Sequence, residues 1–410
     1  MRYMPKASKV VTSTFIIAHS CLLGSYELIC SVFSKPTIIK GTLIGLSQAL
    51  VLTILFIYCH SYIKQIIAEN QQRKEAELSP EKNDVGLTKI DWAQVKESKP
   101  EHVTAGIYLD RIQDFDIVHA RWSYEFYAWF KWNPKKIDFI NLKDSLKGAI
   151  RLENAPVRIV NGSIEHIETR TFYVNSAGDS AYVLLYMTGS TTKFFDIALY
   201  PLDNYLLMIQ LESTAYDIHR LAFMPDSANS NVSSRVSVTG LQLDRNFILS
   251  KPHTIKSSLG DPRTNQNQRN TSSQLRFALF IKRGGISIYL KAFVTLYIAA
   301  LLGFLSFFAA ENDKMRVIVG SLFFAAATLN IIMSRIPSTT GISVAEIVND
   351  VSLITVLLIA ARETAIRYIL RNNPELNSLN KWITFVITFI FYVSINIAIP
   401  VICLNSLDQL

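Results

Sequence analysis

Cysteine is scarce in this sequence and missing from its long polar region. The 410 residues contain four cysteines, which all lie within or beside apolar segments: Cys21, Cys30, Cys59 and Cys403. No cysteine occurs between residues 60 and 402, so the polar region in this interval cannot form a disulfide by itself. A disulfide-rich module is therefore excluded, and the region must depend on its own hydrophobic core.

Metal-binding and catalytic signatures are missing as well. The seven histidines are scattered, with no HxxxH spacing, and no CxxC pair occurs, which leaves a zinc site without support. The chain also has no GxSxG, HExxH or P-loop motif. We therefore expect no metal, no cofactor and no enzymatic activity, and an integral membrane enzyme is the least favoured alternative.

Charged residues make up only 18% of the chain, whereas 50% of the residues are hydrophobic. This balance is too apolar for an ordinary soluble protein and indicates a membrane protein with a polar insert. The net charge of +8 is spread over a linker, loops and helix ends, without a basic stripe. Nucleic acid is therefore not an expected partner.

Apolar segments long enough to cross a bilayer form two clusters, one towards each end of the chain. Their ranges are 10–33 and 38–67 in the first cluster, and 286–308, 315–336, 342–359 and 382–403 in the second. Basic residues precede the first segment, as in a secretory signal, but no convincing cleavage site follows it. We expect an N-terminal transmembrane hairpin, and a cleaved signal remains the alternative.

The second apolar segment is expected to continue as a helix beyond the membrane and to break at Ser79-Pro80, where a charged linker begins. The predicted domains are the N-terminal hairpin (1–67), the charged helix and linker (68–102), a β domain (103–283) and four helices (284–410).

The β domain is predicted from short runs rich in Tyr, Phe, Val and Ile, separated by Gly, Asn, Asp, Ser and Pro. The runs are 104–112, 123–132, 168–176, 181–189, 204–213, 219–225 and 274–282. Alternation is visible at Tyr124, Phe126, Ala128 and Phe130. The expected fold class is an α+β membrane protein, in which an antiparallel β-sandwich precedes a four-helix transmembrane bundle and follows the hairpin.

One apolar helix, residues 311–337, carries charges at its start and an Arg-Ile-Pro stop at its end. At the helical period, one face presents Arg316, Gly320, Phe323, Ala327, Asn330 and Ser334. Polar groups in hydrocarbon cost several kcal/mol unless they are paired or hydrated. This face is therefore expected to contact water or protein and not lipid.

Four stretches carry a family resemblance: Tyr200-Pro201-Leu202-Asp203, VTGLQLDRNF (238–247), LFIKR ending at Arg283, and the helix 313–337. In their order and spacing the chain resembles a bacterial pentameric ligand-gated ion channel, from the disulfide-free branch of the Cys-loop receptor superfamily. The likeness covers about 103–403. Segment 286–308 lacks the proline common in the family, and the N-terminal spans have no counterpart in it.

The resemblance implies a homopentamer with a shared pore for inorganic ions. The implied pore-lining residues are Asp313, Arg316, Gly320, Phe323, Ala327, Asn330 and Ser334. Five Phe323 rings would form a hydrophobic gate, the alternative being that Phe323 packs against a neighbouring helix. Asp313 implies cation selection, but Arg316 opposes it, and charges that merely anchor the helix at the interface are an equal alternative. Selectivity therefore stays open.

The resemblance also implies a coupling interface between the β domain and the pore, formed by Asp114, Asp116, Pro201, Asp203, Arg283 and Arg335. An ion pair between Asp203 and Arg283 is preferred over an Asp203 that only shapes its own turn. Ligand contacts are implied for Tyr216, His219 and Arg263, with a small extracellular molecule or a proton as ligand.

Basic residues between the last two apolar segments, Arg362, Arg367, Arg371 and Lys381, place that loop in the cytoplasm by the positive-inside rule. The β domain is then outside, and the family suggests the bacterial inner membrane with a periplasmic β domain. The same count puts Met1 outside, against the basic residues beside it. A non-conducting pentameric receptor or sensor, signalling through its N-terminal helices, is the alternative function.

Overall fold

The computed structural model describes residues 37–80, 98–140, 150–254, 271–334, 341–369 and 374–407. The chain divides into two compact units. The helical unit comprises residues 1–63, 292–332 and 345–402, and the β unit comprises residues 64–291, 333–344 and 403–410.

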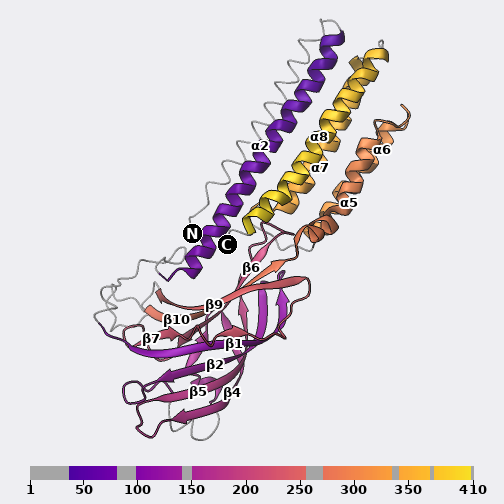
Figure 1. The fold of residues 1–410 in the computed structure, drawn as a ribbon. Helices are drawn as coiled ribbons and strands as arrows, with labels where there is room; N and C mark the ends of the chain where they lie inside the picture. The colour runs from indigo at the N-terminus through magenta and orange to yellow at the C-terminus, as the bar shows by residue number, and fades with distance from the viewer. Residues whose placement is uncertain are drawn as a thin grey trace, which may run out of the picture. The chain divides into compact units, whose positions relative to one another are not determined.

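The first sheet of the β unit is six-stranded (Figure 1). Its strands are β1 (Glu101–Asp116), β2 (Arg121–Trp132), β4 (Gly162–Val174), β5 (Ala181–Thr192), β7 (Leu221–Pro225) and β8 (Asn231–Val232). The order is β4-β5-β2-β1-β7, and β8 pairs with β1. The β1, β2, β4 and β5 pairings are antiparallel, whereas β7 and β8 run parallel to β1.

The second sheet is four-stranded and antiparallel, with the order β3-β6-β10-β9. Its strands are β3 (Val157–Ile159), β6 (Asn204–Ser213), β9 (Leu241–Thr254) and β10 (Thr271–Arg283), and a short helix η1 (Leu152–Asn154) precedes β3. Phe277 at the centre of β10 lies opposite Ile209 on one side and Ile248 on the other. All seven strand segments predicted from the sequence fall within or overlap strands of the two sheets.

The two sheets pack face to face around an apolar core. Tyr124, Phe126, Ala128 and Phe130 of β2 are fully buried, which confirms the alternation in the sequence. Ile159 of β3 reaches across to Gly189 of β5, where a Cβ would come within 2.5 Å of the isoleucine Cδ1. This close approach between sheets requires glycine, because a side chain there would collide with its neighbour.

Strand β9 was not among the predicted runs, since it contains Asp244, Asn246, Lys251 and Pro252, types that are depleted in strands. It forms because β10 provides a partner along its whole length. Pro252 is tolerated because β9 lies at the edge of the second sheet.

Helix α2 (Thr37–Leu78) ends within the β unit. It is continuous to Leu78, as predicted, and then stops before Ser79-Pro80. Leu78 packs against a cluster formed by Leu206 and Met208 of β6 and Ala278 and Phe280 of β10. The side of the second sheet away from the core is therefore covered here by the end of α2, which explains why β6 and β10 are buried along most of their length.

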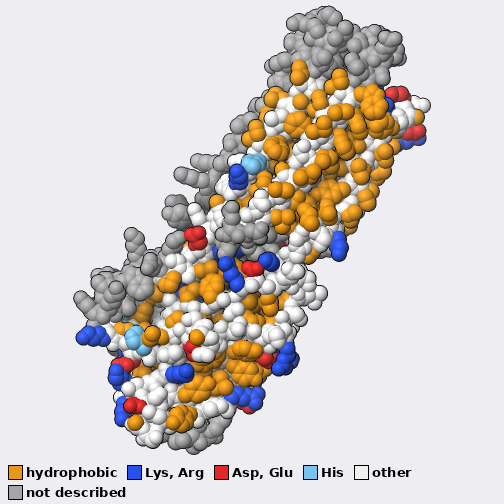
Figure 2. Space-filling model, in the orientation of Figure 1, with side chains coloured by type: hydrophobic (Ala, Val, Ile, Leu, Met, Phe, Trp, Pro, Cys, Tyr) orange, Lys and Arg blue, Asp and Glu red, His pale blue; other side chains and the backbone are white. Residues whose placement is uncertain are grey.

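The other helices are α5 (Gly285–Leu305), α6 (Lys314–Met333), α7 (Val344–Ile369) and α8 (Pro374–Leu407). Together with α2 they make five helices in the described chain that are long and apolar enough to cross a membrane. Hydrophobic side chains cover the visible side of the helical unit (Figure 2). The chain thus combines two β-sheets with membrane-type helices, and the first predicted segment, 10–33, lies outside the described residues.

The predicted basic loop after the third segment of the second cluster is wrong in its extent. Helix α7 continues to Ile369 and α8 begins at Pro374, so Arg362 and Arg367 lie in α7 and Lys381 lies in α8, and not in a loop. No glycine or proline interrupts the sequence between Val344 and Ile369, and a helix can therefore carry these charges past the apolar run.

Gly106 offers a test of packing in the first sheet. It lies opposite Trp129, and a Cβ would come within 2.1 Å of the indole Cζ2. We expect Gly106→Ala to lower the free energy of unfolding by about 1–3 kcal/mol through overpacking. Gly320→Ala is the control, because nothing lies within 4 Å of that Cβ position. Equal melting temperatures for Gly106→Ala and the wild type in detergent would contradict the packing described.

Candidate functional site

One side of α6 packs within the helical unit. Its buried residues are Lys314, Ile318, Ser321, Ala325, Thr328 and Ile332. The Ser321 hydroxyl donates a hydrogen bond of 2.7 Å to the Ala299 carbonyl of α5. Gly303 of α5 lies against Ser321 and Val356, each 3.1 Å from the Cβ position. Small and hydroxyl-bearing residues therefore let α5, α6 and α7 approach closely.

The opposite side of α6 is exposed in the single chain. It contains five of the residues predicted to line a pore, Arg316, Gly320, Phe323, Ala327 and Asn330, and the other two, Asp313 and Ser334, flank the helix and are exposed as well. The exposed fraction of Phe323 is 73%. Phe323 therefore does not pack against another described helix of its own chain, which was the alternative for this ring.

Charges at the start of α6 are arranged in two sets. Asp313 and Arg316 form an exposed ion pair with a separation of 3.2 Å. Lys314 instead turns inward, where its ammonium lies 3.5 Å from a carboxylate oxygen of Glu363 and also contacts Glu311. The Arg362 guanidinium is 2.5 Å from Glu363. This inner set could not be predicted from a local pattern, because Glu363 lies on α7, about fifty residues further along the chain.

In the β unit, Asp203 and Arg283 form the predicted ion pair, at 2.8 Å. The Asp203 side chain is 1% exposed. The Tyr205 hydroxyl donates to Asp203 and accepts a hydrogen bond of 3.2 Å from Arg283. Asp203 directly precedes β6 and Arg283 ends β10, so the pair joins neighbouring strand ends. Burial raises the pKa of Asp203 to about 6, although the Arg283 guanidinium opposes this shift.

The other predicted coupling residues are arranged differently. Asp116 pairs with His119, 2.5 Å away, and exposed Asp114 lies opposite Ser123, so no ion pair with Arg283 is found for either. Phe115 between them instead packs on Phe195 and Tyr205, with ring centroids 4.9 and 5.5 Å apart. An aromatic contact thus links the end of β1 to the pair.

Two further coupling residues complete the predicted set. Pro201 is buried, in the turn before Asp203. Arg335 lies outside the described residues.

The predicted ligand residues are only partly brought together. The Tyr216 hydroxyl donates to the Asp138 carbonyl over 3.0 Å, and the Arg220 guanidinium lies 5.2 Å from its ring centre. His219 is half-buried on the same loop. Arg263 lies outside the described residues.

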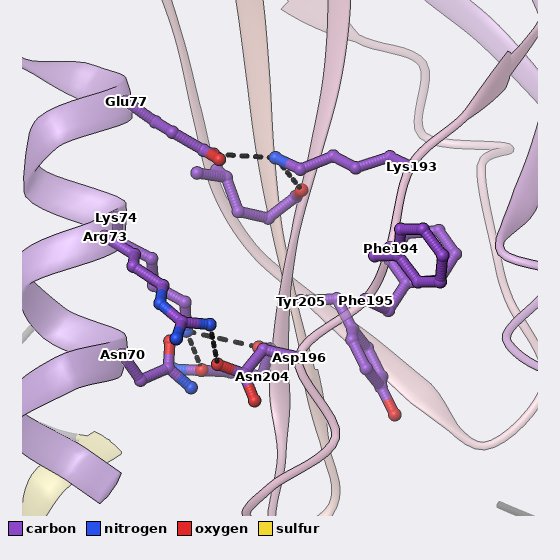
Figure 3. Close-up of a pocket in the computed structure, with 11 residues that line it drawn as sticks. Asn70, Arg73, Lys74, Glu77, Lys193, Phe194, Phe195, Asp196, Asn204 and Tyr205 are labelled. Atoms are coloured by element: carbon purple, nitrogen blue, oxygen red, sulfur yellow. Dashed lines mark hydrogen bonds and ion pairs between the residues drawn. The ribbon is translucent and has the colours of Figure 1, made fainter. Parts of the chain in front are cut away.

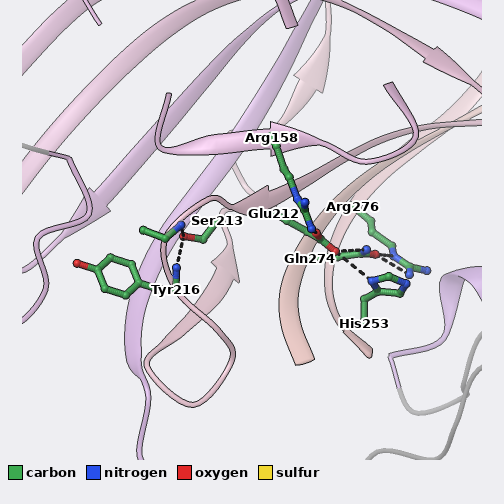
Figure 4. Close-up of polar contacts among 8 residues, drawn as sticks. Arg158, Glu212, Ser213, Tyr216, His253, Gln274 and Arg276 are labelled. Carbon is green, nitrogen blue, oxygen red and sulfur yellow. Dashed lines mark hydrogen bonds and ion pairs between the residues drawn. The ribbon is translucent and has the colours of Figure 1, made fainter. Parts of the chain in front are cut away.

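Glu212, a buried carboxylate that was not predicted from the sequence, lies four residues before Tyr216 in the chain (Figure 4). Glu212, 1% exposed, accepts bonds from Arg158 (2.8 Å) and Gln274 (2.5 Å), and lies 3.1 Å from His253. Burial opposes ionisation, but the bonds from His253, Gln274 and Arg158 outweigh it and lower the pKa of Glu212 to about 2. Only strand pairing brings these residues together, since they come from β3, β6, β9 and β10.

The same network reaches the end of α2. Arg276 donates to Gln274 Oε1 (2.7 Å) and to the Glu77 carbonyl (2.9 Å), and Lys251 donates to the Ala76 carbonyl. Both cations are nearly fully buried. The last carbonyls of a helix have no partner within it and carry partial negative charge, so two buried cations stabilise the end of α2 in place.

No family model matches the chain, and no curated protein matches it in sequence. The described residues contain no group of three His, Cys, Asp or Glu that could hold a metal ion. The features that bear on function are therefore the exposed face of α6, the Asp203–Arg283 pair and the network around Glu212.

The raised pKa of Asp203 predicts how the stability of the fold changes with pH. In the folded protein the pKa of Asp203, about 6, lies above the ordinary value of 3.8, so this group stabilises the fold below about pH 4 and loses that contribution as pH rises through 6. The loss is worth about 3 kcal/mol. Asp203→Asn should remove this slope from melting curves recorded in detergent between pH 4 and 7.

The control for this series is Asp244→Asn, which breaks an exposed pair with Lys282. It should keep the wild-type slope. Parallel curves for Asp203→Asn and the wild type would contradict the assignment.

Proposed function

We propose that the chain is a subunit of a homopentameric ligand-gated ion channel, in which an extracellular β-sandwich controls a pore lined by α6. The observation that supports this most is the division of α6 into a packed side and an exposed side. The exposed side is the one with Arg316, Gly320, Phe323 and Asn330.

Lipid is a poor neighbour for this side of α6. Arg316 and Asn330 would each cost several kcal/mol in hydrocarbon, whereas the same groups cost little against water. Five copies around an axis would give each such face a shared aqueous pore. Five Phe323 rings at mid-depth would then narrow it with apolar surface, and such constrictions gate by losing water.

Within one chain, Asp313 and Arg316 neutralise each other at the inner mouth. This pair therefore does not support a selectivity ring of one sign. The β unit lies outside the membrane in the proposed topology, in the periplasm of a bacterium.

The Asp203–Arg283 pair is the proposed link between ligand and pore. Arg283 ends β10, and α5 begins two residues later at Gly285. A shift of β10 is thus carried along the backbone into the first helix of the pore domain. Making or breaking an ion pair to a buried carboxylate gives two distinct arrangements, and a two-state element of this kind could couple ligand to pore.

Ionic current tests the proposal. Purified full-length protein in a planar bilayer should conduct, and Phe323→Ala should increase current or slow closure, because it widens the apolar constriction. Phe324→Ala is the matched control, since its ring is half as exposed, at 37%, and lies off the pore-facing side. A folded pentamer that stays silent across ligands and pH would favour the alternative, a non-conducting receptor that signals through its N-terminal helices.

A charge swap tests the link. Asp203→Arg and Arg283→Asp should each abolish gating, and the double variant should recover part of it, because the pair is restored with opposite polarity. Current at saturating stimulus is the measurement. Losses that simply add in the double variant would show that the two residues act independently.

A further inference from the structure

A cavity of about 180 Å³ lies in the β unit between the last turns of α2 and the start of β6 (Figure 3). The ionic residues that line it are Arg73, Lys74, Glu77, Lys193 and Asp196. Phe194 lines it as well. The cavity is far larger than one water molecule needs, and its wall is formed by charged and aromatic groups in close proximity.

The ionic lining has an excess of positive charge, with three cations against two carboxylates. Lys193 pairs with Glu77 at 2.6 Å, whereas Arg73 and Asp196 are a loose pair at 3.8 Å. Lys74 is only 5% exposed. Its ammonium contacts the carbonyl and the side-chain oxygen of Asn204, and among the described residues it makes no ion pair.

Lys74 is therefore a nearly buried cation whose contacts are amide oxygens. A buried charge is costly unless an opposite charge compensates it, and the carboxylates of Asp196, Asp203 and Glu77 offset only part of the cost of burying Lys74. Figure 3 shows that Lys193 points towards Glu77 at one end of the cavity, whereas Arg73 and Lys74 end beside Asp196 and Asn204 at the other. An anion that entered the cavity would lie among three cations, of which only Lys74 makes no ion pair with another described residue.

The position along α2 indicates the source of that anion. The apolar run of α2 ends near Ile67, and Arg73 follows six residues later, about 9 Å further along the helix. This distance corresponds to the headgroup layer that borders the hydrocarbon core. Phe194 is 90% exposed beside the basic Lys193, and an aromatic ring next to a cation is typical of segments at a membrane surface.

We propose that this cavity binds the phosphate of an anionic phospholipid headgroup, held by Arg73, Lys74 and Lys193, while Phe194 inserts beside the acyl chains. Arg73 offers a planar fork that matches phosphate oxygens, and the two lysines supply compact charges. Each cation near the surface contributes about 1 kcal/mol of attraction to anionic lipid. Lipid binding at this cavity does not require a pore.

Occupancy would also stabilise the joint between α2 and β6. Lys74 holds Asn204, which directly follows Asp203 of the buried pair with Arg283. The proposed lipid site therefore includes a contact to Asn204, the residue next to Asp203 in the proposed link to the pore. A lipid that draws the Lys74 ammonium towards its phosphate would change the contact with Asn204.

The test uses full-length protein in a neutral detergent. Short-chain phosphatidylglycerol is titrated in, and the melting temperature gives an apparent dissociation constant. We expect the wild type to bind phosphatidylglycerol more tightly than phosphatidylcholine of the same chain length. The double variant R73Q/K193Q should bind phosphatidylglycerol about thirtyfold more weakly.

The control removes the same charge elsewhere: R121Q/K135Q alters two exposed basic residues of the β unit and should bind as the wild type does. Phe194→Ser leaves every charge in place and should weaken the lipid but not inorganic phosphate. Equal binding of both lipids by the wild type, or undiminished binding by R73Q/K193Q, would overturn the proposal. Inorganic phosphate that matches phosphatidylglycerol would assign the cavity to a free anion.

Discussion

The end of α2, held by two buried cations, is the constraint on which the β unit depends. Arg276 and Lys251 point away from the core of the two sheets, to a side where a charged residue would normally face water. They are buried because the Glu77 and Ala76 carbonyls accept their hydrogen bonds. Leu78 adds an apolar contact beside them. Without the end of α2, both cations would lose these carbonyl acceptors and the cluster would lose its contact with Leu78.

Two polar junctions lie at opposite ends of the paired strands β6 and β10. At one end, the Glu212 network connects four strands and continues through Gln274 and Arg276 to α2. At the other, the Asp203–Arg283 pair stands next to Asn204, which is held by Lys74 of the same helix. A displacement of α2 thus bears on both ends of the second sheet. In the proposed channel this would give the membrane a route to the sheet, because α2 continues from its apolar run into the β unit.

In the helical unit, the feature that constrains the structure most is that one side of α6 is packed and the other side is exposed. Ser321 and Gly303 fix its packed side at close range, and the other side is exposed in the part of the chain that the structure describes. Exposed polar residues on a membrane-type helix are stable only against water or another protein surface. The proposed pentamer satisfies both conditions with one arrangement, because neighbouring copies cover the flanks and water fills the centre.

The sequence by itself determined the elements whose signal is local. Apolar runs predicted the membrane-type helices, period-two alternation predicted β2, and the end of α2 before Ser79-Pro80 followed from composition. The pair of Asp203 with Arg283 was also expected, although through a family likeness and not through a pattern.

Tertiary structure alone decided the rest. β9 has a composition that opposes a strand and forms only because β10 pairs with it. Glu212, Lys74 and Glu363 gained their roles from residues far away in the chain, because burial and partners depend on packing that no local pattern records.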